Sequence, residues 1–251
     1  MKRFFLIISL LLMVSVVWGQ EPQTLAQQGD ELYRHGQYDS ALALYNEALA
    51  AGYTSAELHY NVGNTYYRLE QLGPAILHYE RALRLKPSMK EAKENLALAN
   101  SKTQDRIVEL PRLFLVNWYY ALCTHLTPKT WRVIWLVLFA LLAAAVATFM
   151  ISRELPLRKA TFSLAIAAGV LLLLATVLLV SSTRHYNAHA EAIVMEEAIA
   201  VRNSPEQQSL EKLILHEGTK VTVSESLAGW EKITLADGTT GWCESHNIER
   251  I

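Results

Sequence analysis

Two uncharged stretches decide the fold: VIWLVLFALLAAAVATFMIS at residues 133–152 and ATFSLAIAAGVLLLLATVLLVSST at residues 160–183. Neither stretch contains Asp, Glu, Lys or Arg. As helices that rise about 1.5 Å per residue, both are long enough to cross about 30 Å of hydrocarbon. A buried helical hairpin in a soluble protein is the alternative, but the remaining chain is too short to cover two such helices. The sequence therefore predicts transmembrane helices at residues 131–152 and 160–183.

The loop between the two stretches predicts their orientation in the membrane. Residues 153–159 contain Arg153, Arg158 and Lys159 against one acidic residue, Glu154. So short a loop makes the helices antiparallel, and its basic excess places it in the cytoplasm by the positive-inside rule. The segments before and after the hairpin should then both be periplasmic, on one face of a bacterial inner membrane.

The N-terminus, residues 1–19, has the features of a secretory signal peptide. Lys2 and Arg3 precede an apolar run that ends at Trp18, and Gly19 supplies a small residue at a cleavage site. An uncleaved signal anchor is the alternative. Both would carry the following residues across the membrane, so the predicted topology holds in either case.

Charge is distributed unevenly along the chain. Residues 107–184 carry five more basic than acidic residues, whereas residues 20–106 carry two fewer and residues 185–251 carry six fewer. The basic excess therefore lies beside or between the apolar stretches, where a lipid bilayer is the expected partner. The soluble parts are mildly acidic and show no phosphate-binding surface, so we expect no nucleic acid partner.

The segment at residues 20–106 repeats itself at one constant interval. The pairs that match at this interval are Gly29 and Gly63, Tyr38 and Leu72, Ala41 and Ala75, Tyr45 and Tyr79, and Ala48 and Ala82. Small residues at such positions let two helices approach closely, and the tyrosines fill the gap between helix pairs. The pattern resembles the tetratricopeptide repeat, whose period is about 34 residues. It implies repeats at about residues 22–55 and 56–89, followed by a capping helix at residues 89–103.

Tetratricopeptide stacks bind protein segments in a concave groove, and the resemblance implies that outward positions of each first helix line it. These positions are Gln27, Asp30, Tyr33, Arg34, Tyr60, Asn61, Asn64, Tyr67, Arg68, Glu94 and Asn95. Asparagine amides can hydrogen-bond an extended backbone, and tyrosines supply rigid contact area. The alternative is that the asparagines cap or solvate helices. We expect Glu47 and Arg81 to be exposed on the opposite, convex face.

The segment at residues 107–128 is rich in Phe, Trp and Tyr but is interrupted by Arg112 and Asn117. An amphipathic helix lying in the membrane interface fits this composition, since Trp and Tyr prefer that zone. A third crossing is the alternative, and it would put the repeats on the other face of the membrane. Thr127 and Pro128 predict the N-cap and first turn of the first transmembrane helix.

Residues 190–251 alternate apolar and polar side chains with a period of two. Turn signals stand at Glu217-Gly218, Ala228-Gly229 and Asp237-Gly238. Short strands at this spacing predict a small all-β barrel. The segments AIAVRNSP, HEGTKVTV and GWEKITLADGTTGWCESHNI resemble the bacterial SH3-like domain. Trp230 and Trp242 are too few aromatics for a proline-rich peptide groove, and Cys243 is expected to be a buried small hydrophobe.

The sequence contains no P-loop, no glycine-rich nucleotide fingerprint and no G-x-S-x-G elbow. His185 and His189 stand four positions apart and would share a helix face, as metal ligands do, but no third ligand is evident beyond Glu191. Cys123 and Cys243 lie far apart and lack metal-binding spacing. We therefore expect no enzyme activity, no cofactor and no metal site.

The order of these segments predicts a multidomain membrane protein with tetratricopeptide repeats, two transmembrane helices and a C-terminal SH3-like barrel. That order resembles the BatE family of the bacterial aerotolerance (Bat) operon over nearly the whole chain. The resemblance implies protein partners: other Bat membrane proteins, including those with von Willebrand A domains, and a MoxR-type ATPase. We expect a non-enzymatic scaffold in an envelope complex linked to aerotolerance or stress. The alternative is a cell-wall sensor whose SH3-like domain binds peptidoglycan.

Overall fold

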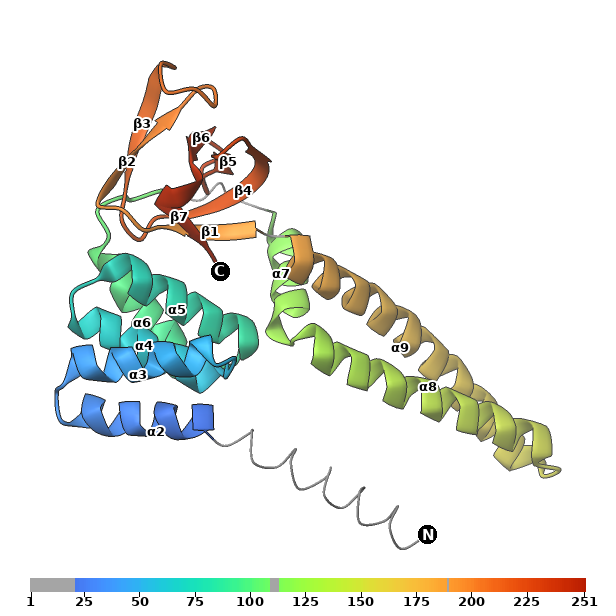
Figure 1. The fold of residues 1–251 in the computed structure, drawn as a ribbon. Coiled ribbons are helices and arrows are strands. Elements are labelled where there is room, and N and C mark those ends of the chain that lie inside the picture. Colours follow the sequence, from blue (N-terminus) through green and yellow to red (C-terminus); the bar gives the residue numbers. More distant parts are fainter. Residues whose placement is uncertain (1–20, 109–112, 189) are drawn as a thin grey trace, which may run out of the picture. The chain divides into compact units, whose positions relative to one another are not determined.

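The computed structural model describes residues 21–108, 113–188 and 190–251 (Figure 1). The predicted signal peptide therefore lies outside the described residues. The chain divides into two compact units. The repeat–sheet unit combines residues up to Val108 with Glu191–Ile251, and the helical unit is formed by Glu109–Ala190.

The repeats are built from five helices within the described residues. They are α2 (Glu21–Arg34), α3 (Tyr38–Ala50), α4 (Ala56–Arg68), α5 (Leu72–Leu85) and α6 (Lys90–Lys102). Each helix packs on the next along the chain, and the first helices α2, α4 and α6 are also neighbours. The period of the sequence thus corresponds to one helix pair, as predicted.

Local sequence signals account for the ends of these helices. Ser55 caps α4, where its hydroxyl accepts a 3.0 Å hydrogen bond from the backbone N–H of Leu58. Pro74 lies in the first turn of α5, where its missing N–H costs no helical hydrogen bond. Gly36 follows α2 with a φ of 75°, a conformation in which glycine avoids the steric penalty of a Cβ.

The repeating small residues and tyrosines form the core of the repeats. Tyr45 and Tyr79 are each 1% exposed and lie against the glycine of the preceding helix. A Cβ built on Gly29 would lie 2.6 Å from the ring of Tyr45, and one on Gly63 would lie 2.8 Å from the ring of Tyr79. The close approach predicted from the sequence is therefore confirmed in both repeats.

The C-terminal strands form one antiparallel sheet within the described residues. They are β1 (Ala190–Val194), β2 (Ala198–Arg202), β3 (Glu211–His216), β4 (Lys220–Leu227), β5 (Trp230–Thr234), β6 (Thr240–Glu244) and β7 (Ile248–Arg250). The predicted turns are confirmed, since Gly218, Gly229 and Gly238 each have a φ of 85°.

The sheet does not close into the predicted barrel. Its strand order is β3-β2-β6-β5-β4-β1-β7, so β3 and β7 are edge strands. β2 pairs with β3 along its length but with β6 only at Arg202 and Trp242, so the β2–β3 hairpin diverges from the remaining strands. The short strand β7 pairs with β1. The sequence predicted the strands and turns, whereas closure depends on pairing between distant edges.

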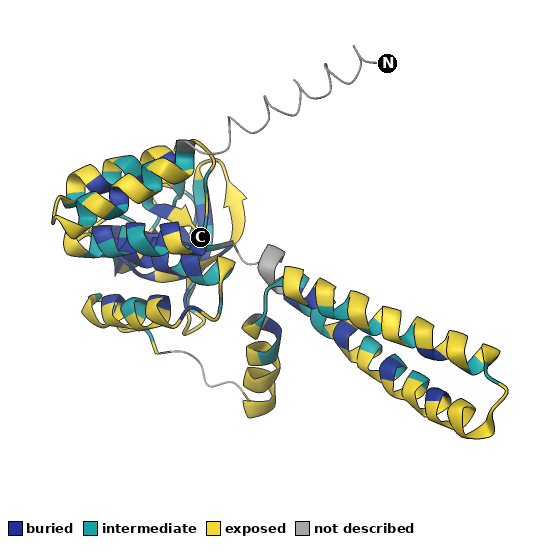
Figure 2. Ribbon diagram, turned by 90° about the horizontal axis from the view of Figure 1, so that it is seen from below, coloured by how far each residue is buried: buried dark blue, intermediate teal, exposed yellow. Residues whose placement is uncertain are grey.

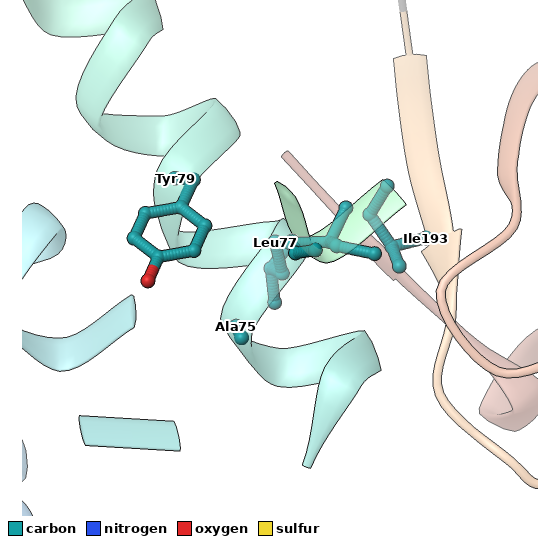
Figure 3. Close-up of a cluster of buried hydrophobic side chains, with 6 residues drawn as sticks. Ala75, Leu77, Tyr79 and Ile193 are labelled. Carbon is teal, nitrogen blue, oxygen red and sulfur yellow. The ribbon is translucent and has the colours of Figure 1, made fainter. Parts of the chain in front are cut away.

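The last repeat and the sheet share one hydrophobic core, which the sequence did not indicate (Figure 3). Ile76 and Leu77 of α5 cluster with Ile193 of β1, and each of the three is at most 1% exposed. Met195 and Ile251 pack against the same cluster. The repeats and the sheet therefore form one folded unit rather than two independent modules.

Polar contacts reinforce this shared core. Gly73 at the start of α5 donates a 2.8 Å hydrogen bond to the Glu217 carboxylate, and Lys220 lies 3.1 Å from Glu80 of α5. The guanidinium of Arg81 lies 2.8 Å from the Glu249 carboxylate. The expectation that Arg81 is exposed on a free convex face is therefore wrong, because the sheet covers that side of α5.

Asp105, which follows α6, is the most heavily bonded residue of this interface. Its carboxylate accepts hydrogen bonds of 2.7 Å from the backbone N–H of His216, from the His216 ring and from the Thr219 hydroxyl. Burial opposes ionisation of Asp105, but the hydrogen bonds from Thr219 and His216 outweigh it and hold the pKa of this carboxyl below its usual range. The contribution of Asp105 to stability is thus present near neutral pH and is lost only as the pH falls through its lowered pKa.

We expect the Asp105→Ala substitution to lower the free energy of unfolding of the repeat–sheet unit by about 2–3 kcal/mol, because it leaves the three donors of His216 and Thr219 without their acceptor. The measurement is hydrogen exchange of α5, α6 and β4 in the purified full chain. Glu47→Ala on α3 is the matched control, since Glu47 is exposed and its removal should change stability by no more than about 0.5 kcal/mol. Equal exchange in both variants would show that this contact does not hold the unit together.

The helical unit contains α7 (Phe114–His125), α8 (Pro128–Ile151) and α9 (Leu155–Ala188). Both α8 and α9 are long and apolar enough to cross a membrane. Only 6% of the most apolar window of α8 and 11% of that of α9 are buried, and Figure 2 shows exposed residues along both helices. The core helix of a soluble protein would be mostly buried, so this exposure favours contact with lipid.

Small residues form the seam between α8 and α9. On α9 the buried positions Thr161, Ala168, Ala175 and Ser182 recur at heptad spacing. Ala145 of α8 is also buried, and the Trp135 indole N–H donates a 2.9 Å hydrogen bond to the Thr176 hydroxyl. Small residues at heptad spacing are typical of close helix packing in membranes.

The helix ends differ from the predicted boundaries at the connector. Thr127 caps α8 as predicted, accepting a hydrogen bond from Thr130 N–H. However, α9 begins at Leu155, so the connector consists of residues 152–154 and not of residues 153–159. The physical reason is that proline is favourable in the first turn of a helix, and the LPLRK segment of α9 places one there.

The aromatic segment contains α7, and its large side chains are mostly exposed. Phe114 is 76% exposed and Trp118 is 67% exposed, while Cys123 is buried. α7 packs against α9, where the Tyr119 hydroxyl is hydrogen-bonded to that of Ser181. Exposed aromatic side chains beside an apolar hairpin are typical of a helix in the membrane interface.

Candidate protein-binding surface

The candidate surface is the side of α2, α4 and α6 that carries the eleven residues predicted to bind a partner; we call it the first-helix face. Four of these side chains are exposed: Gln27, Arg34, Arg68 and Glu94. The other seven are half-buried: Asp30, Tyr33, Tyr60, Asn61, Asn64, Tyr67 and Asn95. The neighbouring packing of the three helices brings residues from both repeats and the cap onto one surface.

Asp30 joins the first repeat to the second on this face. Its Oδ1 accepts a 2.7 Å hydrogen bond from the Tyr45 hydroxyl and a 2.8 Å hydrogen bond from the Asn61 amide. Burial, together with the hydrogen bond to Asp30, raises the pKa of Tyr45 well above its usual value. The phenol therefore stays protonated and remains a donor to Asp30.

The same arrangement recurs one repeat later. Oδ1 of Asn64 accepts a 2.8 Å hydrogen bond from the Tyr79 hydroxyl and a 2.7 Å hydrogen bond from the Asn95 amide. Asn95 also lies 3.3 Å from the hydroxyl of Tyr60. Burial raises the pKa of Tyr79, which keeps this donor protonated too. Each first helix is thus tied to the next by an acceptor, a tyrosine and an asparagine at equivalent positions.

These contacts give the asparagines a structural role, while their role in binding a partner stays a prediction. Asn61 donates one amide hydrogen bond to the preceding first helix, and Asn95 donates two, to Asn64 and to Tyr60. A side-chain amide has two N–H donors and a carbonyl acceptor, so each retains capacity for a bound backbone. Removing Asn61, Asn64 and Asn95 together would therefore loosen the stack as well as the surface, and it is a poor test of binding.

A second recurring contact places cations on tyrosines of the preceding first helix. Tyr33 lies near the Arg68 guanidinium and raises its pKa. Nζ of Lys102 lies 4.4 Å from the ring centre of Tyr67, within range of a cation–π interaction. Lys102 was missed in the sequence analysis, although it follows Arg68 at the interval of one repeat.

Metal-binding and nucleophilic groups are a separate question. Among residues 21–108, 113–188 and 190–251, no group of three or more His, Cys, Asp or Glu side chains is placed to hold a metal ion. His189 lies outside the described residues, so its relation to His185 is not described. Cys243 is fully buried, as predicted, and burial with the nearby Glu231 raises the pKa of its thiol to about 12. Such a thiol carries little thiolate at neutral pH.

Comparison with known proteins identifies the repeats. Residues 27–90 match the family model of the tetratricopeptide repeat. The chain is also similar to the inactive TPR repeat-containing thioredoxin TTL3 of Arabidopsis thaliana, with 32% identity over 79 residues. That alignment covers 32% of this chain and 11% of the relative, so the chain spans about a tenth of the relative's length. The helical repeats of this protein are therefore tetratricopeptide-like.

Proposed function

We propose that this protein is a non-enzymatic scaffold, anchored in a membrane by α8 and α9, that binds a protein partner through the first-helix face. The observation that carries this proposal is the conjunction of two features in one chain. Tetratricopeptide-like repeats present a half-exposed surface of tyrosines and polar side chains on α2, α4 and α6. The same chain holds two apolar helices whose side chains are largely uncovered.

The shared core of the repeats and the sheet supports the two-crossing topology. Leu77 of α5 and Ile193 of β1 lie in one cluster, so both must be on the same side of any membrane that the chain crosses between them. Two crossings, by α8 and α9, satisfy this condition. A third crossing by α7 would separate the repeats from the sheet, so α7 is better placed in the interface.

We place the repeat–sheet unit in the periplasm of a bacterial inner membrane. The connector carries Arg153, and Arg158 and Lys159 follow in the first turns of α9, which favours a cytoplasmic position for this end of the hairpin. The order of segments resembles that of BatE-type proteins, and on that resemblance the partners are other Bat membrane proteins, including those with von Willebrand A domains. The scaffold would then serve an envelope complex linked to aerotolerance or stress.

Photo-cross-linking in native membranes tests this function. A photoreactive phenylalanine analogue replaces Tyr67 on the first-helix face in one variant and Glu47 on α3 in the other. We expect position 67 to yield a discrete cross-linked protein that position 47 does not. Identical products from both positions, or none from position 67, would contradict binding at this face.

A second candidate function is cell-wall binding by the sheet. This candidate depends on the resemblance of residues 190–251 to the bacterial SH3-like domain. Ile214 on edge strand β3 and the nearby Leu210 are exposed and could form the binding surface. Because the sheet shares its core with the repeats, the test requires the full chain. Binding of the detergent-solubilised chain to purified peptidoglycan sacculi, abolished by Ile214→Lys, would favour this function.

A further inference from the structure

Three cations form a row across the first-helix face. Arg34, Arg68 and Lys102 follow one another at intervals of one repeat. Each lies in the last turn of its helix, α2, α4 or α6, and each is exposed. Because these three helices are neighbours, the cations succeed one another across the stack; we call them the basic row.

The tyrosines of the preceding helix hold two members of the basic row in place. Lys102 lies over the ring of Tyr67, with Nζ 4.4 Å from the ring centre, and Arg68 lies near Tyr33. Tyr33 and Tyr67 occupy equivalent positions in successive repeats, so the contact belongs to the repeat and not to one position. Side chains that are ordered before binding lose less entropy when a ligand binds.

Compensation of the helix macrodipole is the simplest alternative role for these cations. A cation in the last turn stabilises its own helix by about 0.3–1 kcal/mol. That role requires no contact with the neighbouring helix and leaves the side chain free to point elsewhere. The repeated contact with the preceding tyrosine is therefore unexplained by dipole compensation alone.

The basic row is also largely unneutralised. Arg34 pairs with Glu31, which also contacts His35. Among the salt bridges of the described residues, neither Arg68 nor Lys102 takes part in one. Two ordered positive charges thus remain available to an anionic ligand, with a third shared with Glu31.

We propose that the partner segment bound by the first-helix face is an extended acidic peptide whose carboxylates dock on the basic row. This inference rests on the proposed function and specifies the chemistry of the partner. Neighbouring helix axes lie about 8–10 Å apart, and an extended chain in the polyproline II conformation advances about 3.1 Å per residue with about three residues per turn, so that every third side chain points the same way. Acidic side chains at every third residue therefore match the spacing of Arg34, Arg68 and Lys102.

The test measures peptide binding to the purified full chain in detergent by fluorescence anisotropy. The probe is a labelled peptide of serines with three glutamates at every third position. A peptide of the same composition with its three glutamates adjacent is the matched control ligand. We expect the spaced peptide to bind at least about fivefold more tightly, with an affinity that falls as salt is added, because the charges at this surface are exposed.

Charge reversal identifies the surface that binds the probe. We expect the double substitution Arg68→Glu and Lys102→Glu to weaken binding of the spaced peptide by at least about tenfold, since like charges then face each other. Lys93→Glu is the control, because Lys93 is exposed on α6 about 13 Å along the helix from Lys102. That variant should change the affinity by less than about twofold.

Three outcomes would overturn the acidic-peptide inference. They are equal affinity for the two peptides, equal weakening by Lys93→Glu, and binding of the chain to anionic vesicles through the basic row with no binding of peptide. The proposed function can be separated from this inference by the cross-linking experiment. If position 67 still captures its protein in the Arg68→Glu and Lys102→Glu variant, the scaffold function stands and the acidic partner is wrong.

Discussion

Replacing Gly63 with leucine is expected to unfold the repeats or to lower their free energy of unfolding by about 3 kcal/mol or more. A Cβ at this position would lie 2.8 Å from the ring of Tyr79 and 3.2 Å from the backbone oxygen of Ala75. Tyr79 is 1% exposed, so its ring has no space into which to move. The backbone of α5 would have to shift, and α5 also carries the core shared with the sheet.

Hydrogen exchange of the full chain in detergent measures this effect helix by helix. We expect faster exchange in α4, α5 and β1 together, because their residues pack in the connected clusters around Tyr79. Ala43→Leu is the matched control, since Ala43 is exposed on α3 and leucine is a good helix former. Exchange in α4 and α5 that is unchanged by Gly63→Leu would show that the helices are not packed in this register.

The second large effect is expected from acid, through a buried pair of histidines between α4 and α5. Nδ1 of His59 lies 3.0 Å from Nδ1 of His78, and the two residues are 8% and 6% exposed. Thr54 lies 3.1 Å from the other ring nitrogen of His59, and Tyr66 packs beside His78. One ring must donate the proton between the two Nδ1 atoms while the other accepts it, so the contact requires at least one neutral ring.

Burial lowers the pKa of both rings, and the nearby Arg81 lowers it further. The pKa of His59 falls to about 4 and that of His78, which also faces His59, falls to about 3. In the unfolded chain both would titrate near 6.5, so the unfolded state binds more protons as the pH falls below that value. We expect the repeats to lose about 2–4 kcal/mol of stability between pH 7 and pH 5, measured as the change in melting temperature.

The first repeat supplies the control variant for this prediction. Leu25 and Leu44 occupy the positions one repeat before His59 and His78, so leucine suits both positions. The double substitution His59→Leu and His78→Leu should abolish most of the acid sensitivity between pH 7 and pH 5 while leaving the repeats folded. An equally acid-sensitive double variant would show that other groups are responsible.

Local and periodic features of this fold were predictable from the sequence. The constant interval identified the helix pairs because Gly63 and Tyr79 repeat the packing of Gly29 and Tyr45. The turns of the sheet were predictable because glycine suits the positive φ that they require. The apolar hairpin was predictable because residues 133–152 and 160–183 form two long stretches without charged side chains.

Contacts between distant segments were not predictable in this way. Ile193 lies in a short apolar run, residues 192–195, of a kind that many strands contain, and nothing local indicates that it enters a core formed by α5. Arg81 has the appearance of a solvent-exposed helix residue, yet it pairs with Glu249, which lies 168 residues away. The prediction of a closed barrel was wrong for the same reason, because pairing between the two edge strands depends on tertiary geometry.

The candidate surface was predicted in outline but not in its internal contacts. All eleven predicted residues lie on α2, α4 or α6, but the amides of Asn61 and Asn95 also tie one first helix to the next. Lys102 continues the series begun by Arg34 and Arg68, and only the structure shows it over the ring of Tyr67. The periodicity that identified the helices therefore also contained the signal for the basic row.

Cysteine labelling with a membrane-impermeant maleimide tests the central claim most directly, namely that a two-helix anchor holds one repeat–sheet unit on one face of a membrane. Single cysteines replace Glu47 in the repeats, Glu206 in the loop between β2 and β3, or Arg153 between α8 and α9. The native Cys123 and Cys243 are buried and should react little. In spheroplasts we expect labelling at positions 47 and 206, and labelling at position 153 only after the membrane is opened. Labelling of positions 47 and 206 from opposite sides, or of all three from the same side, would contradict this account.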